Sequence, residues 1–262
     1  MFELQYILIG IIQGITEFLP ISSSGHLVLF AQLTNWKDQG LFTDIAVHFG
    51  TLFAVMIYLR KDIYYFFNNI FQFKLFEDQI IFKIILATLP AIILGYFIYE
   101  YVSLYFRSIQ LIALSSIVFA IILFFADKVK METKNWNKIT YIEAFIVGLF
   151  QVLAFIPGAS RAGVTITGAR LLGYDRLNAA RFSMILSIPI ILASMTLSFI
   201  NIFREKYVEV NLYQSFFSAI VSFITAMLSI IFLMNFIKKF NFNIFIIYRV
   251  LIGILLLLFV QI

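Results

Sequence analysis

The sequence has no cysteine, only four prolines and few charged residues for its 262 positions. Without cysteine, disulfide bonds, thiolate catalysis and cysteine-ligated zinc are excluded. Charged residues account for 13% of the chain, against roughly a quarter in soluble domains, whereas hydrophobic residues account for 62%. So little charge cannot cover a surface in water, and we therefore expect lipid to surround most of the molecule.

What the chain does have is a series of long apolar runs. Several reach roughly 18 residues, the length at which a helix can cross the hydrocarbon core of a bilayer. We therefore predict an all-α integral membrane protein. The first run lacks a basic leader and a small-residue cleavage site, so we interpret it as mature protein and not as a signal peptide. The apolar runs are approximately 1–19, 41–59, 84–100, 109–126, 141–157, 178–200, 213–237 and 244–262.

The formal net charge of +5 comes from Lys and Arg residues in the short connections between these runs. The basic connections are 60–83, 127–138 and Lys238-Lys239, and the positive-inside rule places them in the cytoplasm. The less basic connections 101–108 and 201–212 should face outward. Membrane orientation accounts for the positive charge, so we expect no nucleic-acid partner.

The number of crossings constrains the topology further. An inside connection at 127–138 and an outside connection at 201–212 require an odd number of crossings, yet two apolar runs lie between them. We interpret 141–157 as a re-entrant segment that turns back through the polar stretch 158–168. Non-helical backbone at membrane depth occurs only where protein or a water-filled cavity satisfies it, so this turn also indicates function.

The first half of the chain repeats this order, because the run 1–19 also leads into a proline and a polar stretch. We predict a single transmembrane domain, 1–262, with about six transmembrane helices plus two re-entrant helix hairpins arranged as an inverted repeat. The repeats are approximately 1–126 and 139–262. The hairpins would meet near the midplane from opposite sides, and both termini would lie outside.

The first polar cluster is QGITEFLPISSSGH, residues 13–26. Gln13 and Glu17 are four residues apart and share a helix face. A carboxylate within the membrane is costly unless paired or hydrated, so Glu17 is a candidate functional residue. Beyond the proline, the sequence offers hydroxyls, free backbone N–H groups and an imidazole able to transfer protons. The residues concerned are Ser22, Ser23, Ser24, Gly25 and His26.

The second polar cluster is PGASRAGVT, residues 157–165. Gly158 allows close backbone approach, and Arg161 stands between Ser160 and Thr165 at the start of a short predicted helix. A guanidinium with hydroxyls at a helix N-terminus suits phosphate oxygens. If the clusters meet, they combine a carboxylate, an imidazole, hydroxyls and a guanidinium, which are sufficient to hydrolyse a phosphoanhydride.

Structural readings of the same residues stay open. Gln13 and Glu17 could simply pair with Arg161 to lock the two halves together. The three serines could form only a turn, and His26 alone could be a satisfied buried group.

Other polar residues are interpreted as structural. Asp44 and His48 could support the site from behind, but we favour a structural or interfacial role. Local pairing and headgroup contact explain Arg170, Asp175, Arg176 and Arg181. Glu143 is interpreted as a helix cap. Arg249, near the inner end of the last span, is expected to snorkel.

Residues 13–26 and 157–165 together resemble the undecaprenyl-diphosphatase family, also known as bacitracin-resistance proteins. The resemblance continues through 44–54, 181–189 and Tyr248-Arg249. It implies a bacterial plasma-membrane enzyme that hydrolyses undecaprenyl diphosphate to undecaprenyl phosphate and inorganic phosphate. Such an enzyme recycles the lipid carrier of wall polymers and confers bacitracin resistance, because bacitracin sequesters the diphosphate. The resemblance also implies polyprenyl diphosphate and membrane lipids as partners, and the oligomeric state stays open.

The resemblance assigns roles to individual residues. It implies Glu17, His26, Ser23 and Arg161 as catalytic residues. It implies contacts with substrate or phosphate from Gln13, Ser22, Ser24, Gly25, Gly158, Ser160 and Thr165. Family members are described with a divalent cation, Mg²⁺ or Ca²⁺, which Glu17 and Gln13 would hold together with substrate oxygens. This sequence has Ala162 where the family usually has serine, which removes one hydroxyl from the second cluster.

The sequence leaves the nucleophile undecided. Ser23 could attack after activation by His26 or Glu17, or the same pair could activate water. We expect the site to open to the outer face. The alternative class is a polyprenyl-phosphate transporter or flippase, because secondary transporters also build midplane sites from broken helices in inverted repeats.

Overall fold

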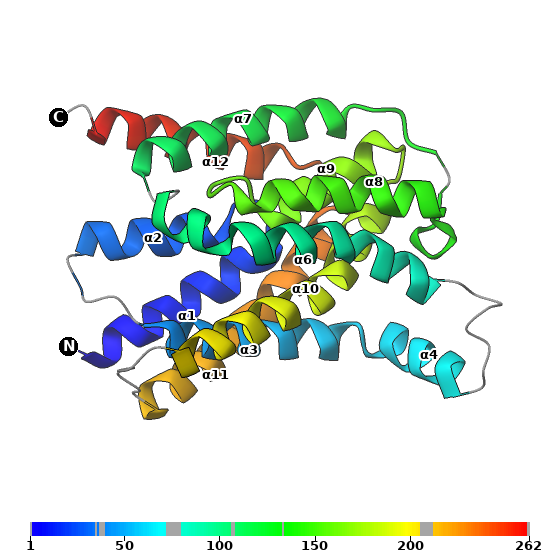
Figure 1. Cartoon of the computed structure of the whole chain (residues 1–262). Coiled ribbons are helices and arrows are strands. Elements are labelled where there is room, and N and C mark those ends of the chain that lie inside the picture. The colour runs from blue at the N-terminus through cyan, green and yellow to red at the C-terminus, as the bar shows by residue number, and fades with distance from the viewer. Residues whose placement is uncertain are drawn as a thin grey trace.

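A computed structural model describes residues 2–34, 36, 40–71, 80–105, 108–132, 134–204 and 212–260. All the regular elements in these ranges are helices, as Figure 1 shows. The first half contains α1 (Phe2–Phe18), α2 (Ser23–Thr34), α3 (Leu41–Tyr58), α4 (Arg60–Phe71), α6 (Ile80–Tyr105) and α7 (Ile109–Asp127). The second half contains η1 (Trp136–Lys138), α8 (Tyr141–Val152), η2 (Leu153–Phe155), α9 (Arg161–Leu171), α10 (Arg176–Arg204), α11 (Leu212–Phe236) and α12 (Asn243–Val260).

Five helices in the described ranges are long and apolar enough to cross a membrane: α3, α6, α7, α10 and α11. They match five of the six predicted spans, and large apolar side chains are exposed along them, as expected for contact with lipid. The sixth, α12, counts among the shorter apolar helices over its described residues. The chain is therefore a multi-pass membrane protein, as its composition predicts.

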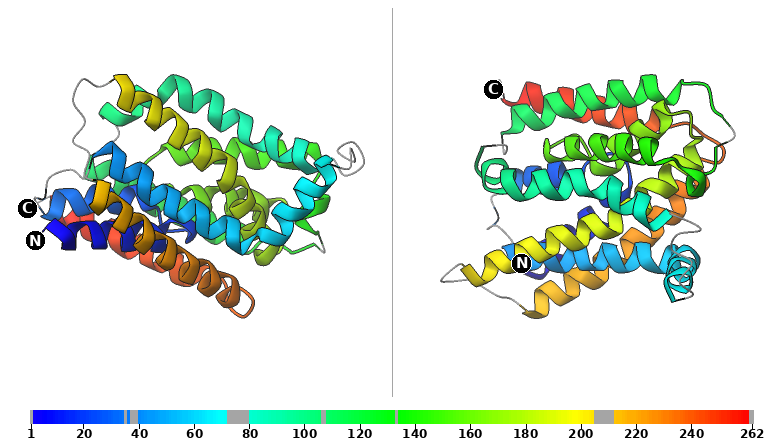
Figure 2. Two further views of the ribbon diagram at one scale, coloured as in Figure 1. Left: turned by 90° about the horizontal axis from the view of Figure 1, so that it is seen from below. Right: turned by 45° about the vertical axis from the view of Figure 1, so that its right-hand side comes forward.

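The two predicted re-entrant segments each form a helix hairpin. α1 begins near the N-terminus and α2 returns to the same end of the bundle, whereas α8 and α9 enter and leave at the opposite end (Figure 1). Both views in Figure 2 place the two termini at one end and α4 at the other. The hairpins thus enter from opposite ends, as predicted. That an exact twofold axis relates the two halves stays a prediction.

Helix packing is reciprocal between the halves. α1 packs against α11 of the second half, and α8 packs against α6 of the first. Each contact includes a glycine where a side chain would collide with backbone. A Cβ on Gly10 would lie 2.7 Å from the Ser218 oxygen, and one on Gly148 would lie 2.5 Å from the Ala87 oxygen. Small residues let membrane helices approach this closely.

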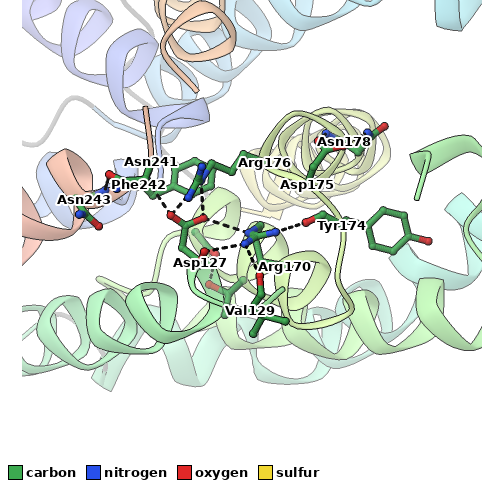
Figure 3. Close-up of polar contacts among 12 residues, drawn as sticks. Asp127, Val129, Arg170, Tyr174, Asp175, Arg176, Asn178, Asn241, Phe242 and Asn243 are labelled. Atoms are coloured by element: carbon green, nitrogen blue, oxygen red, sulfur yellow. Dashed lines mark hydrogen bonds and ion pairs between the residues drawn. The ribbon is translucent and has the colours of Figure 1, made fainter. Parts of the chain in front are cut away.

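The end of the bundle opposite the termini holds a buried ion network, which Figure 3 shows. Asp127, at the end of α7, accepts hydrogen bonds from Arg170 Nε (3.1 Å), Arg176 Nε (2.8 Å) and the Phe242 backbone N–H (3.3 Å). Arg170 is fully buried and also donates to the carbonyls of Asp127, Val129 and Tyr174. The network therefore ties α7 and α9 to the starts of α10 and α12.

A second ion pair lies at the same end. Arg181 of α10 donates to both carboxylate oxygens of Asp62 in α4, and its guanidinium lies 5.5 Å from the centre of the Trp136 ring. The arginines around the start of α10 are therefore paired, but the prediction of local partners is wrong. Their carboxylate partners, Asp127 and Asp62, come from distant parts of the chain.

The predicted cap at Glu143 is confirmed. Thr140 accepts a hydrogen bond from the Glu143 backbone N–H at 3.2 Å, and Glu143 Oε2 accepts one from the Thr140 N–H at 2.9 Å. This reciprocal capping box satisfies two N–H groups that a helix start would leave unpaired. Lys134, in the preceding connection, donates to Glu143 Oε1 at 3.0 Å. That hydrogen bond, together with nearby Glu132, raises the pKa of Lys134.

Candidate active site

Both polar clusters place a serine in a left-handed backbone conformation immediately before a helix. Ser22 (φ 75°) precedes α2 and Ser160 (φ 70°) precedes α9, and they are the non-glycine residues with positive φ in the described chain. Such a conformation costs a residue with a side chain roughly 1–3 kcal/mol. Each serine hydroxyl accepts a hydrogen bond from the backbone N–H three residues later, at Gly25 (3.4 Å) or Gly163 (3.1 Å).

This shared geometry aligns the two clusters residue by residue. Ser23 follows the first left-handed serine and Arg161 follows the second. Both residues start a helix and project toward the region where the two hairpins meet. The two hairpin turns therefore share one local backbone geometry.

Glu17 joins the two hairpins. Its Oε1 accepts a hydrogen bond from Arg161 Nη2 at 2.8 Å, and its Oε2 accepts from Gln13 Nε2 at 2.9 Å and from Ser23 Oγ at 3.0 Å. Glu17 is 8% exposed and Gln13 is fully buried. The structure thus brings together four of the residues predicted for the site, with a carboxylate paired to the guanidinium and bonded to a serine hydroxyl.

Arg161 is held from two further directions. Its Nη1 donates to the Ser183 carbonyl at 3.2 Å, and its guanidinium lies 5.7 Å from the centre of the Phe18 ring. Ser183 also pairs with Thr165 through their hydroxyls at 2.7 Å. Thr165 is fully buried, and its hydroxyl donates to the Arg161 carbonyl. Thr165 therefore supports the backbone of Arg161, and its predicted contact with phosphate stays a prediction.

His26 lies apart from Glu17 and Ser23 in its hydrogen bonding. Its Nδ1 lies 2.6 Å from the Ser22 carbonyl oxygen, which can only accept, so Nδ1 carries the proton. In the neutral ring Nε2 is then an acceptor, and it receives the hydroxyl of Tyr248 at 2.7 Å. The sequence analysis included Tyr248 in the family resemblance but gave it no role in the site. Its only sequence signal is a tyrosine-arginine pair within an apolar run.

Arg249 corrects a prediction. It does not snorkel to the membrane surface, because it is 1% exposed and lies between the two hairpin turns. Its Nη1 donates to the Pro20 carbonyl at 3.4 Å, and its Nη2 donates to the carbonyls of Gly158 (2.8 Å) and Ala159 (3.0 Å). The prediction failed because the sequence does not show that the turn of the second hairpin packs against the middle of α12.

Gly158 shows how tightly that second turn is packed. Its φ is +91°, and a Cβ there would lie 2.2 Å from Ser115 Oγ and 2.5 Å from the Ile112 oxygen. The predicted need for close backbone approach is confirmed, although the approach is to α7. Whether Gly158, Ser24 or Gly25 also contacts phosphate stays a prediction.

The site residues differ in how exposed they are to the surroundings. We call the more exposed ones, Ser23, Ser24, His26 and Arg161, the reactive edge. Ser24 is exposed, and Ser23, His26 and Arg161 are partly exposed. Glu17 and Ser160 are buried beneath them. Asp44 and His48 lie on α3, where His48 Nδ1 is 2.7 Å from the Asp44 carbonyl oxygen in the same helix. An anion approaching this edge would meet the guanidinium and the serine hydroxyl together.

The site contains one buried side-chain oxygen, Gln13 Oε1, that could coordinate a divalent cation. Gln13 Nε2 faces a carboxylate oxygen, which fixes the amide orientation and leaves Oε1 buried without a hydrogen-bond donor among the described residues. Glu17 is the nearby carboxylate. Within the described ranges there is no group of three His, Cys, Asp or Glu side chains that could hold a metal alone. The residues fit a cation only if the substrate supplies further oxygens.

The fold and the site together define a class: a multi-pass membrane protein whose polar site lies between two re-entrant hairpins. A family model described as "Bacitracin resistance protein BacA" matches residues 6–255. A curated relative from Saccharophagus degradans, named undecaprenyl-diphosphatase, is 43% identical over 254 residues, which make up 95% of this chain and 95% of the relative. The chain belongs to the bacitracin resistance protein BacA family.

Proposed function

We propose that the chain is an undecaprenyl-diphosphate phosphatase of the bacterial plasma membrane. It hydrolyses undecaprenyl diphosphate to undecaprenyl phosphate and inorganic phosphate, which recycles the lipid carrier for cell-wall synthesis and confers bacitracin resistance. Family membership and the relative's name support this function. The apolar, lipid-exposed helices suit a substrate with a long prenyl tail.

One observation carries the proposal: Arg161, Glu17 and Ser23 form a continuous hydrogen-bonded chain across the two hairpins. Arg161 presents a planar, permanently charged fork for phosphate oxygens. Ser23 places a hydroxyl beside a carboxylate that can accept its proton. These are the components that phosphoryl transfer requires, namely charge stabilisation and a positioned nucleophile.

Of the two nucleophiles left open by the sequence, the geometry favours Ser23 with Glu17 as its base. Ser23 Oγ would attack the terminal phosphorus as its proton passes to Glu17. The bond from that phosphorus to the bridging oxygen breaks, and undecaprenyl phosphate leaves with the electron pair. Water then hydrolyses the phosphoserine, releasing inorganic phosphate and restoring Ser23.

The hydrogen bonds of His26 suit a different role. Its Nε2 is paired with the Tyr248 hydroxyl and not with Ser23. We assign this pair to proton transfer with the leaving phosphate or with the water of the second step, since His26 is partly exposed and Tyr248 is exposed.

A divalent cation, Mg²⁺ or Ca²⁺, would be held by Gln13 Oε1 and Glu17 together with diphosphate oxygens. When bound, it would supply charge neutralisation on the phosphate oxygens. Removing it with a chelator should lower turnover, and adding Mg²⁺ or Ca²⁺ should restore it. Phosphate release that is equal with and without chelator would remove the cation from the proposal.

The test of the function is phosphate release from undecaprenyl diphosphate by the purified full-length chain in detergent. We expect turnover by the wild type and loss of about 100-fold or more in kcat for Arg161→Ala, because a single preorganised donor contributes that much. Lys238→Ala, an exposed change in the connection between α11 and α12, is the control and should turn over normally. A folded but inactive wild type would overturn the proposal.

A lipid flippase is the second candidate, because hairpins that enter from opposite ends also occur in secondary transporters. A flippase needs no phosphate release. Moving labelled undecaprenyl phosphate across proteoliposomes without hydrolysing the diphosphate would favour it over the phosphatase.

A further inference from the structure

Two arginines are fully buried among the described residues, and they differ in whether a carboxylate neutralises their charge. Arg170 is 0% exposed and bonds to the Asp127 carboxylate, so its charge is compensated (Figure 3). Arg249 is 1% exposed, and among the described residues it pairs with carbonyl oxygens and with no carboxylate. A buried charge without a counter-charge is strongly unfavourable, so it requires an explanation.

The carbonyl contacts do not use all the donors of Arg249. A guanidinium has about five N–H donors. Nη1 and Nη2 bond to carbonyls, whereas Nε is buried and has no hydrogen-bond partner in the described part of the chain. Nη1 also lies 3.0 Å from the position of a Cβ built on Gly163, in the first turn of α9. The guanidinium therefore lies beside a helix N-terminus, which itself carries partial positive charge.

The charges of the neighbouring side chains do not neutralise it. Arg161 and Glu17 form an ion pair at 2.8 Å and cancel each other. His26 binds the Ser22 carbonyl, two residues from the Pro20 carbonyl that Arg249 binds, and in its neutral form it adds no charge. The region where the hairpins meet therefore retains the positive charge of Arg249.

We propose that Arg249 supplies the uncompensated positive charge that binds the diphosphate of the substrate, so that the lipid headgroup is its missing counter-ion. This assignment rests on the proposed function and names a binding residue for the same site. Arg249 holds the carbonyls of both hairpin turns, so its charge is fixed in position before substrate arrives. A preorganised charge at low dielectric attracts an anion more strongly than a solvated one.

The test separates the charge of Arg249 from its hydrogen bonds. Arg249→Lys keeps the charge but loses the fork, whereas Arg249→Gln keeps an N–H donor group but loses the charge. We expect Arg249→Gln to raise KM for undecaprenyl diphosphate, and the inhibition constant of inorganic pyrophosphate, by about tenfold or more. Arg249→Lys should change both by less than about threefold. Equal effects of the two substitutions on KM would show that substrate binding depends on the hydrogen bonds of Arg249 to the two hairpin turns and not on its charge. That result would overturn the assignment.

A pH profile of Arg249→Lys tests the same point if the glutamine variant does not fold. A buried lysine loses its proton far more readily than arginine. KM of Arg249→Lys should therefore rise with increasing pH relative to wild type, which has the same Glu17, His26, Tyr248 and Arg161 around the site. Parallel profiles up to about pH 10, near the pKa of a free lysine, would overturn the assignment.

Arg170→Gln is the matched control, since it removes a buried arginine whose charge is already compensated. It should lower the melting temperature without changing KM or the pyrophosphate inhibition constant. A wild type that releases no phosphate would refute the proposed function. A wild type that turns over, combined with an Arg249→Gln variant of unchanged KM, would refute only the role of Arg249.

Discussion

Tyr248 offers a residue-scale test of the histidine's role, because its hydroxyl is the partner of His26 Nε2. Tyr248→Phe removes that hydrogen bond and keeps the ring, which lies parallel to the imidazole within 6°. We expect kcat to fall by about tenfold and KM to stay nearly constant, less than the roughly 10²–10⁴ that general acid–base catalysis contributes. Loss of the Tyr248 hydroxyl should also shift the pH profile of kcat, because His26 Nε2 loses its hydrogen-bond partner.

His26→Ala should cost more than Tyr248→Phe, and the double variant should be no worse than His26→Ala alone. If the two effects instead multiply, Tyr248 acts independently of the histidine. Circular dichroism and gel filtration of each variant control for misfolding.

Gly158 should not tolerate even the smallest side chain. Gly158→Ala combines a left-handed backbone with a collision against Ser115 Oγ and the Ile112 carbonyl. Backbone strain and overpacking cost roughly 1–3 kcal/mol each, so we expect unfolding free energy to fall by at least about 2 kcal/mol. Thermal unfolding in detergent measures it. A Gly40→Ala variant is the control, because Gly40 also has a positive φ but open space around it.

The sequence predicted that Glu17 and Arg161 could pair between the two hairpins, and there is a physical reason for that success. Glu17 and Arg161 are charged residues beside apolar runs, and their burial is costly without a function or a partner. The same argument misplaced Arg249 and overlooked Tyr248. Their positions depend on which distant segment packs against the middle of α12, and no local pattern encodes that.

At the scale of elements, the network at Asp127 should hold the re-entrant helix α9 in place from the end opposite Arg161. Asp127→Ala leaves Arg170 buried with carbonyl partners but without its carboxylate, which should cost about 3–5 kcal/mol of unfolding free energy. Arg170→Met should also destabilise, because it leaves the carboxylate with fewer donors. The double variant Asp127→Ala/Arg170→Met should be less destabilised than the sum of the two. Additive losses, measured by thermal unfolding, would show that the pair is not coupled.

The elements themselves were mostly predictable. Run length and loop charge predicted five spans and both hairpins, because hydropathy and crossing parity depend only on local composition. The helix α4 (Arg60–Phe71) was missed, since its mixed polar and aromatic sequence lacks a long apolar run. Its exposed Tyr64 and Tyr65 fit a helix at the membrane interface, where aromatic residues concentrate.

The whole molecule can be oriented by experiment because the chain has no cysteine. We expect single cysteines at Lys61 and Lys239 to react with a membrane-impermeant maleimide only after the cytoplasmic face is opened. A cysteine at Ser108, at the other end of the bundle, should react in intact cells. Labelling of all three from the same side would contradict the predicted orientation. Phosphate release by each variant confirms that it is folded.

The paired left-handed serines have a consequence for how this protein could have arisen and how it can be divided. The position after Ser22 carries a potential nucleophile, Ser23, and the position after Ser160 carries a cation, Arg161. Ancestral duplication of one hairpin would have provided two equivalent positions that then specialised. Ser23 lies in the first half and Arg161 in the second, so each half should release no phosphate when it is produced alone. Co-expression of the two halves should restore phosphate release if they assemble into one bundle.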